Sequence, residues 1–352
     1  MSKQLGKVEQ SFLESVIQVQ CGAIQPLLKN KPQFGVDVAI VELPNSGQVM
    51  AVTSDPLSLI PSLGLEESAW LSVHLLANDM ATTGFAPMFA QMVLNLPAWF
   101  SKEDFKTYWG YIHQFCKEIG VAITGGHTGF IEGQNSTIAG GGTFWNFCPM
   151  GQVLTTLQAR EGDVILVTKQ SAISSAAILA MSFPETVANR LGKEIQQKVA
   201  SLFYETSSLK DALIASAGEP QKRGISAMHD VTEGGVLGAI YEMVTAADKG
   251  VLVYDEKIPV SQEVREICNL FELDYRYCVG AGAMIIACHP NKAPDIIRNL
   301  QTEKIECSVV GEIKPKEFGK KLLQGDSTID MPYFDTDPYW NAFFKAWQSG
   351  WK

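Results

Sequence analysis

Carboxylates occur in this chain at the ends of apolar segments, where they could bind a cation. Asp37 lies inside the apolar stretch FGVDVAIV, and a charge there is costly unless it is paired or bound to a metal ion. Asp55 follows a Val-rich segment in TSDP. In LLANDMATTG, Asn78 and Asp79 interrupt a helical pattern although both are poor helix formers. Each of these residues taken alone also fits a solvent-exposed position.

The type of ligand indicates which cation would bind. Carboxylate oxygens with few basic side chains among them favour Mg²⁺ over zinc. Converging carboxylates without a cation would repel one another and raise their pKa values. If these segments meet, a divalent ion is therefore expected between them.

The segment MHDVTEGGVLGAIYEM suggests a further acidic site at the start of a helix. One interpretation is structural, with Asp230 as the helix cap and Glu233 three residues later completing a capping box. Gly234 and Gly235 argue against a purely structural role, because each glycine costs a helix about 0.8–1 kcal/mol relative to alanine. They fit a helix start that another backbone or an anionic ligand approaches closely.

The segment ITGGHTGF places two glycines directly after a short apolar stretch. We predict a strand followed by a turn, in which Gly125 and Gly126 let backbone N–H groups approach a phosphate. Neutral imidazole binds Mg²⁺ poorly, so His127 would contact phosphate or substrate, or else be structural.

Two common site types are not supported by the sequence. GGHTGF lacks the frame and the lysine of a Walker loop, and no G-x-G-x-x-G motif follows a predicted strand. The five histidines show no H-x-x-x-H spacing, and the seven cysteines contain no Cys-x-x-Cys pair. A zinc hydrolase and a disulfide framework are therefore not expected.

Strands and helices alternate in both halves of the chain. Strands are predicted over 34–43, 48–57, 88–96, 121–124 and 136–147, and helices over 66–83 and from Ser101 to Gly120. A break near 154–163 is followed by a strand, a long helical stretch over 172–217, and further strands and helices. We therefore expect two α+β or α/β lobes, a domain over 1–155 and another over 156–352.

Composition limits the functional classes. The 352 residues are 46% hydrophobic and 19% charged, with a net charge of −10. That balance is typical of a globular protein and argues against a nucleic-acid surface, which needs cations to neutralise phosphates. No apolar run approaches the roughly 18 residues that span a membrane, and the scattered cysteines suit reduced thiols. We expect a cytoplasmic protein with no membrane partner.

The order and spacing of the motifs are more specific than any one of them. GVDVAIV, VTSDP, LLANDMATTGFAP, ITGGHT and MHDVTEGGVLGAIYEM together resemble the aminoimidazole ribonucleotide (AIR) synthase-related, PurM-like ATP-binding superfamily, over about residues 30–315. HDVTEGG and IPVSQEVREIC look most like its hydrogenase maturation branch, HypE. The resemblance implies an N-terminal lobe that forms a β-barrel with the same lobe of a second subunit, a C-terminal α/β lobe, a homodimer, and ATP with Mg²⁺ between the lobes.

The resemblance also implies roles for individual residues. Metal ligands would be Asp37, Ser54, Asp55 and Asp79. Catalytic residues would be Asp79, His127, Asp230 and Glu233. Nucleotide contacts would come from Gly125, Gly126, Thr128, Lys169, Thr232 and Gly234.

Some positions depart from that pattern. Val36 replaces an acidic residue common before the first aspartate, and TKQSAISS lacks a Gly-rich turn, although Lys169 could reach a phosphate. The chain ends WQSGWK where the HypE branch carries a reactive cysteine, so chemistry on such a thiol is not expected to run in the same way.

These features predict an ATP- and Mg²⁺-dependent enzyme that phosphorylates an oxygen of a small substrate. A maturation partner protein is a further expectation. Two alternatives stay open, a non-catalytic nucleotide-binding maturation scaffold and an AIR synthetase-type ATP-dependent cyclase.

Overall fold

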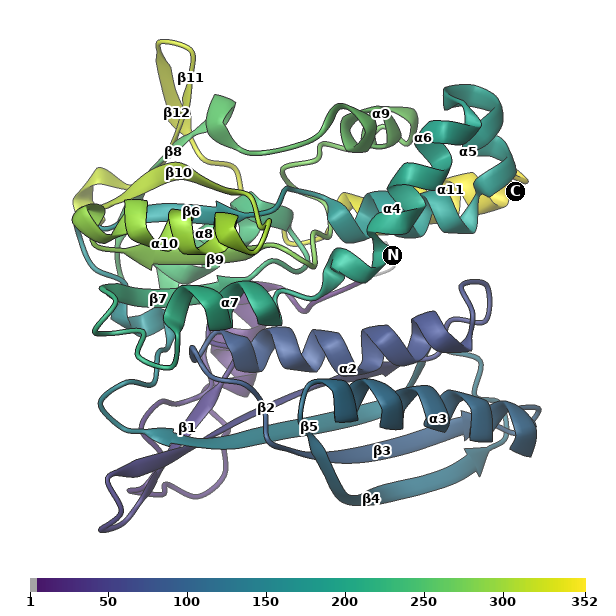
Figure 1. The fold of residues 1–352 in the computed structure, drawn as a ribbon, viewed down its shortest axis with the longest axis horizontal. Helices are drawn as coiled ribbons and strands as arrows, with labels where there is room; N and C mark the ends of the chain where they lie inside the picture. Colours follow the sequence, from purple (N-terminus) through teal and green to yellow (C-terminus); the bar gives the residue numbers. More distant parts are fainter. Residues whose placement is uncertain (1–4) are drawn as a thin grey trace.

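The computed structural model describes residues 5–352, which form two α/β lobes stacked on one another (Figure 1). The lobes are built on a five-stranded and a seven-stranded sheet. The predicted two-lobed α+β fold is therefore confirmed. Among the described residues, no helix combines the length and apolar character needed to cross a membrane.

The N-terminal lobe is a five-stranded sheet with helices on one face. Its strand order is β1 (Ala39–Leu43), β2 (Gln48–Ser58), β5 (Ile138–Pro149), β3 (Phe89–Pro97) and β4 (Ala122–Ile131). Only β3 and β4 pair in parallel, and α3 (Lys102–Glu118) makes the crossover that this pairing needs. Helix α2 (Leu65–Ala81) lies between this sheet and the other lobe (Figure 1).

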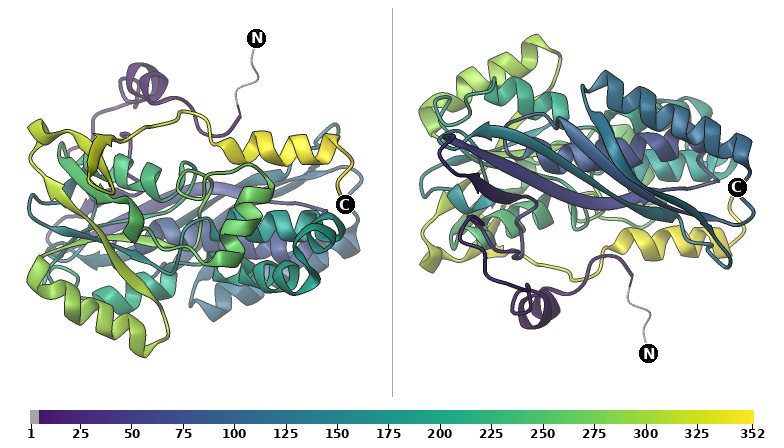
Figure 2. Two further views of the ribbon diagram at one scale, coloured as in Figure 1. Left: turned by 90° about the horizontal axis from the view of Figure 1, so that it is seen from above. Right: turned by 90° about the horizontal axis from the view of Figure 1, so that it is seen from below.

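The opposite face of this sheet is open. Residues along β3 and β5 alternate between buried and exposed positions, so one face packs on α2 and α3 and the other faces outward. Figure 2 shows no helix over that outward face. In this single chain the sheet is not a closed barrel, and the predicted barrel would need a second copy.

The C-terminal lobe is built on the larger sheet. Its strand order is β12 (Ser327–Asp330), β11 (Lys320–Gln324), β8 (Gly250–Tyr254), β10 (Cys307–Lys314), β6 (Val164–Thr168), β9 (Met284–Cys288) and β7 (Ile225–Asp230). Its helices are α4 (Ile173–Ser182), α5 (Pro184–Leu191), α6 (Lys193–Ala200), α7 (Leu209–Ser216), α8 (Gly235–Ala246), α9 (Gln262–Leu270), α10 (Ala293–Thr302) and α11 (Pro338–Gln348).

Several predicted elements differ in length from the observed ones. The helix from Ser101 to Gly120 is confirmed, with the Ser101 hydroxyl accepting from the Asp104 N–H. The helical stretch 172–217 divides into α4–α7, because Pro184 starts a new helix and Gly192 has φ +99°. Strand β1 begins at Ala39, so Asp37 lies in the loop before it and not within a strand.

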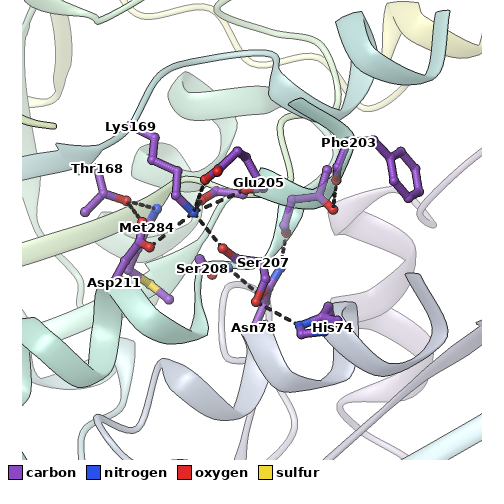
Figure 3. Close-up of polar contacts among 12 residues, drawn as sticks. His74, Asn78, Thr168, Lys169, Phe203, Glu205, Ser207, Ser208, Asp211 and Met284 are labelled. Carbon is purple, nitrogen blue, oxygen red and sulfur yellow. Dashed lines mark hydrogen bonds and ion pairs between the residues drawn. The ribbon is translucent and has the colours of Figure 1, made fainter. Parts of the chain in front are cut away.

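The two lobes share one hydrophobic core. Leu76 and Met80 of α2 belong to the same buried cluster as Leu209 and Ala212 of α7. Polar contacts continue this interface (Figure 3): the buried Asn78 amide donates to the Thr206 carbonyl at 2.9 Å and accepts from the Ser208 N–H at 2.7 Å. Helix α2 is therefore fixed against the C-terminal lobe at the point where Asp79 follows Asn78.

Candidate metal and nucleotide site

Carboxylates from the two lobes meet around His229. Asp37 comes from the loop before β1, and Asp230 is the last residue of β7. His229 Nδ1 lies 3.5 Å from Asp37 Oδ2 and 3.8 Å from Asp230 Oδ1. One potential ligand atom of each of these three residues lies within 4.8 Å of the others, so the carboxylates of Asp37 and Asp230 could share one ion. Asp37 and Asp230, which lie far apart in the sequence, therefore meet in the folded chain.

The oxygen atoms of this cluster have few partners. Asp37 Oδ2 and both carboxylate oxygens of Asp230 are buried and accept no hydrogen bond from the described residues. Buried polar atoms of this kind normally have a partner, so their number at one place requires an explanation. A hard divalent cation would supply it, because carboxylate oxygens are its preferred ligands. The residues present therefore fit Mg²⁺.

Asp55 and Asp79 extend the cluster along the N-terminal lobe. Thr53 and Asp55 point to the same side of β2, and the Thr53 hydroxyl donates to Asp79 Oδ2 at 2.8 Å. Burial raises the pKa of Asp55 to about 6, with Lys7 opposing the shift and Asp37 adding to it. Burial and then Asp230 hold the pKa of Asp79 well above its usual range.

The same effect operates at Asp230. Burial, followed by the charge of Asp37, raises its pKa to about 7. Raised carboxyl pKa values are what crowded carboxylates show without a cation between them, and a bound divalent ion would reverse them.

His229 was not identified from the sequence. Its Nδ1–H donates to the Asp230 carbonyl at 2.7 Å, and its Nε2 lies 3.4 Å from Glu242 Oε2. Burial alone would lower the pKa of His229, but Asp37 and Glu242 outweigh burial and raise it to about 9. At neutral pH the imidazolium therefore acts as a positive charge among the carboxylates. Its place directly before Asp230 was the one sequence signal for it.

Lys7 is a second cation that the sequence did not reveal. Its Nζ donates to Thr232 Oγ1 at 2.9 Å and lies 3.5 Å from Glu242 Oε2. Its backbone N–H donates to Glu233 Oε2 at 2.8 Å. More than 220 residues separate Lys7 from each of these partners, so no local pattern could indicate the contact.

The start of α8 does not form the predicted capping box. The helix begins at Gly235, and Asp230 is the end of a strand, so the structural interpretation of Asp230 as the cap is wrong. Gly235 has φ +63°, and a Cβ there would lie 2.6 Å from the Arg276 carbonyl oxygen, so this glycine admits a neighbouring backbone. The Gly234 N–H donates to Asp337 Oδ2 at 2.7 Å. A carboxylate of the chain itself thus occupies the anion position predicted there.

ITGGHTGF does not form a strand followed by a turn. Residues 122–131 are one continuous strand, β4, at the edge of the sheet, so the predicted turn is wrong. A Cβ on Gly126 would lie 1.7 Å from the Met92 carbonyl oxygen. Glycine is therefore required at this position because the neighbouring strand β3 passes so close. Gly125, His127 and Thr128 are exposed. Their role in phosphate binding stays a prediction.

Ser54 and Lys169 also lie apart from the carboxylates. Ser54 points to the other side of β2 from Asp55, where its hydroxyl hydrogen-bonds Thr143 Oγ1 at 2.8 Å, so the geometry does not support it as a ligand in this chain. Lys169 Nζ donates to the carbonyls of Glu205, Ser207 and Gly282 and lies 3.1 Å from Asp211 Oδ1 (Figure 3). All of these partners belong to the C-terminal lobe, as Lys169 does, and its phosphate contact stays a prediction.

Comparison with known sequences relates the chain to a described protein family. The model for AIR synthase related proteins matches over residues 35–144 for the N-terminal domain and 160–321 for the C-terminal domain. Carbamoyl dehydratase HypE of Azotobacter vinelandii is 25% identical over 284 residues, covering 80% of this chain and 79% of that protein. The Escherichia coli HypE is 25% identical over 275 residues, covering 74% and 75%.

Solved structures share the fold. A HypE–HypF complex contains a chain that matches with a TM-score of 0.72 and 19% identity, over 92% of this chain and 100% of that chain. A ThiL structure with AMPPCP and TMP matches with 0.70 and 13%, over 93% and 97%. HypE in complex with ATP matches with 0.65 and 17%, over 94% and 95%. At these identities the similarity establishes the two-lobed architecture alone.

Proposed function

Because the chain belongs to the family of AIR synthase-related proteins, we propose that it is an ATP- and Mg²⁺-dependent enzyme that activates an oxygen of a small substrate by phosphoryl transfer. The observation that carries the proposal is the cluster of buried carboxylate oxygens without partners, contributed by Asp37 and Asp230 from different lobes. Relatives named as carbamoyl dehydratases and the ATP- and AMPPCP-bound neighbours support the same reaction class.

In the proposed reaction, the residues of this chain position and neutralise charge. Mg²⁺ bound by Asp37 and Asp230, with Asp55 and Asp79 close by, would offset the negative charge of the nucleotide phosphates. Thr53 fixes the orientation of the Asp79 carboxylate through its hydrogen bond. Since Asp37 and Asp230 belong to different lobes, the site is complete only when the lobes keep their present relation. Phosphoryl transfer depends mainly on such positioning.

ADP formation tests the proposal. Purified protein is incubated with ATP, Mg²⁺ and a panel of carboxamides and carboxylates as acceptors. We expect acceptor-dependent ADP release that falls at least about 100-fold in Asp37→Asn and in Asp230→Asn, the scale on which lost transition-state charge stabilisation acts. Asp326→Asn, at an exposed position, is the matched control and should behave as wild type.

The same assay separates the proposal from its main alternative. Nucleotide binding without ADP release from any acceptor would favour a non-catalytic maturation scaffold. A chain in a HypE–HypF complex is among the structural neighbours, and this supports a maturation partner protein as a further part of the proposal.

We also propose that two copies associate through the open face of the N-terminal sheet. Val93, Ile138 and Phe147 on its strands are 41%, 46% and 40% exposed, which is high for apolar residues of a sheet. Light scattering should give twice the chain mass, and Val93→Asp should give the mass of one chain. Ile329→Asp, at an exposed apolar residue of β12, is the control and should stay dimeric. A wild-type mass of one chain would contradict this.

A further inference from the structure

The N-terminal segment lies across the carboxylate cluster and supplies a positive charge to it. The Lys7 ammonium contacts Thr232 and Glu242. Partial desolvation of the amine would lower the pKa of Lys7, but Glu242, Asp37 and other carboxylates outweigh it and raise the pKa, so the amine is charged at neutral pH. Lys7 is therefore a cation tethered at Glu242, next to the carboxylates that would bind a divalent ion.

The fit of this segment is close at one point. Gly6 has φ +83°, which other residues rarely adopt, and a Cβ there would lie 2.3 Å from Glu233 Oε2, so a larger residue would strain the backbone and displace that carboxylate. Glu233 accepts from the Lys7 N–H on one oxygen and from Trp340 Nε1 on the other, at 2.8 and 3.3 Å. Glu233, for which a catalytic role is predicted, is thus held between the N-terminal segment and helix α11.

The segment is weakly held beyond that point. The α-helical turn Gln10–Phe12 and the π-helical turn Leu13–Ile17 that follow Lys7 bury no residue, and Val8 and Phe12 are each 51% exposed. Figure 2 shows this helical turn standing away from the body of the protein. About half of the Lys7 side chain is itself exposed. Few contacts would therefore have to break for the segment to leave the cluster.

We propose that residues 5–9 form a displaceable strap, in which the Lys7 ammonium lies beside the acidic cluster and opposes Mg²⁺ binding until a Mg²⁺–nucleotide complex displaces it. The inference rests on the proposed function, because it assumes that the carboxylates bind Mg²⁺. Lys7 and Mg²⁺ would be two cations beside the same carboxylates and would repel one another, so the closed strap lowers the apparent metal affinity. If the strap is closed about nine-tenths of the time, the apparent affinity falls about tenfold.

Calorimetric titration tests the strap without using activity. Mg²⁺, alone and with a non-hydrolysable ATP analogue, is titrated into wild type, Lys7→Met and Gly6→Val. Lys7→Met removes the positive charge. Gly6→Val displaces the strap but keeps the charge of Lys7. Both should bind Mg²⁺ about tenfold more tightly than wild type. Lys106→Met, which removes a charge from an exposed position on α3, should leave the affinity unchanged.

The outcomes are distinct. Weaker binding of the nucleotide complex in Lys7→Met would overturn the strap and make Lys7 a phosphate ligand. Unchanged affinity in both variants would overturn it as well, while leaving the proposed function standing. If neither wild type nor the variants bind Mg²⁺ or nucleotide, the proposed function fails and this inference with it. Hydrogen exchange adds a second readout, because the Lys7 N–H should lose protection when the complex binds.

Discussion

The Asn78→Ala variant tests whether α2 fixes the two lobes as described. The Asn78 side chain is buried and makes two hydrogen bonds across the interface, to the Thr206 carbonyl and from the Ser208 N–H. Truncation leaves one buried acceptor and one buried donor without partners, at about 1–3 kcal/mol each. The expected loss in free energy of unfolding is therefore about 2–6 kcal/mol.

Urea denaturation followed by tryptophan fluorescence measures this loss, since Trp70 lies at the same interface and donates to Thr206 Oγ1. Asn269→Ala is the matched control, because Asn269 is an exposed helical asparagine and the same substitution there reports helix propensity alone. We expect the control to change stability by less than about 1 kcal/mol. A loss below about 1 kcal/mol in Asn78→Ala, relative to this control, would refute the account of the interface.

Three further outcomes follow from other contacts. Gly126→Ala should destabilise the N-terminal lobe by more than about 2 kcal/mol in thermal unfolding, because the added Cβ would clash with the Met92 carbonyl oxygen. Gly110→Ala in α3, where the added Cβ has free space, is the control and should be neutral or stabilising, and equal effects of the two variants would contradict this explanation. With an aromatic disulfide reagent at pH 8, only Cys21 of the seven thiols should react quickly in the native state, since the others are buried, and a second fast thiol would count against the packing. Burial raises the pKa of Asp337 to about 6. The pKa of Asp337 in the folded state therefore exceeds its unfolded value. As pH rises from about 4 to 7, the free energy of unfolding of wild type should fall by up to about 3 kcal/mol relative to that of Asp337→Asn. A difference in free energy of unfolding that does not change with pH would contradict this.

Local signals were sufficient where an element is determined by its own residues. The cap at Ser101 and the stop at Gly120 predicted α3 within a few residues, because both act through neighbouring backbone groups. Likewise the separate acidic segments around Asp37, Asp79 and Asp230 could be identified, since charges in apolar stretches are costly wherever they occur.

Long-range contacts could not be predicted in this way. The two glycines of ITGGHTGF have the composition of a turn, but Gly126 is required by the carbonyl of Met92 on a neighbouring strand. The cations of the site, His229 and Lys7, act through tertiary contacts with carboxylates from other segments. A pattern based on one segment contains no information on such pairs, so the charge balance of the site became visible only in the folded chain.

The central claim is that carboxylates from both lobes bind Mg²⁺ and, with it, ATP. Calorimetric titration of ATP into the purified protein, with and without Mg²⁺, tests it most directly in wild type and Asp79→Ala. We expect binding in wild type that requires Mg²⁺ and is lost in the variant, while circular dichroism shows that the variant keeps its fold. ATP binding that is independent of Mg²⁺, or equal in wild type and Asp79→Ala, would contradict the account.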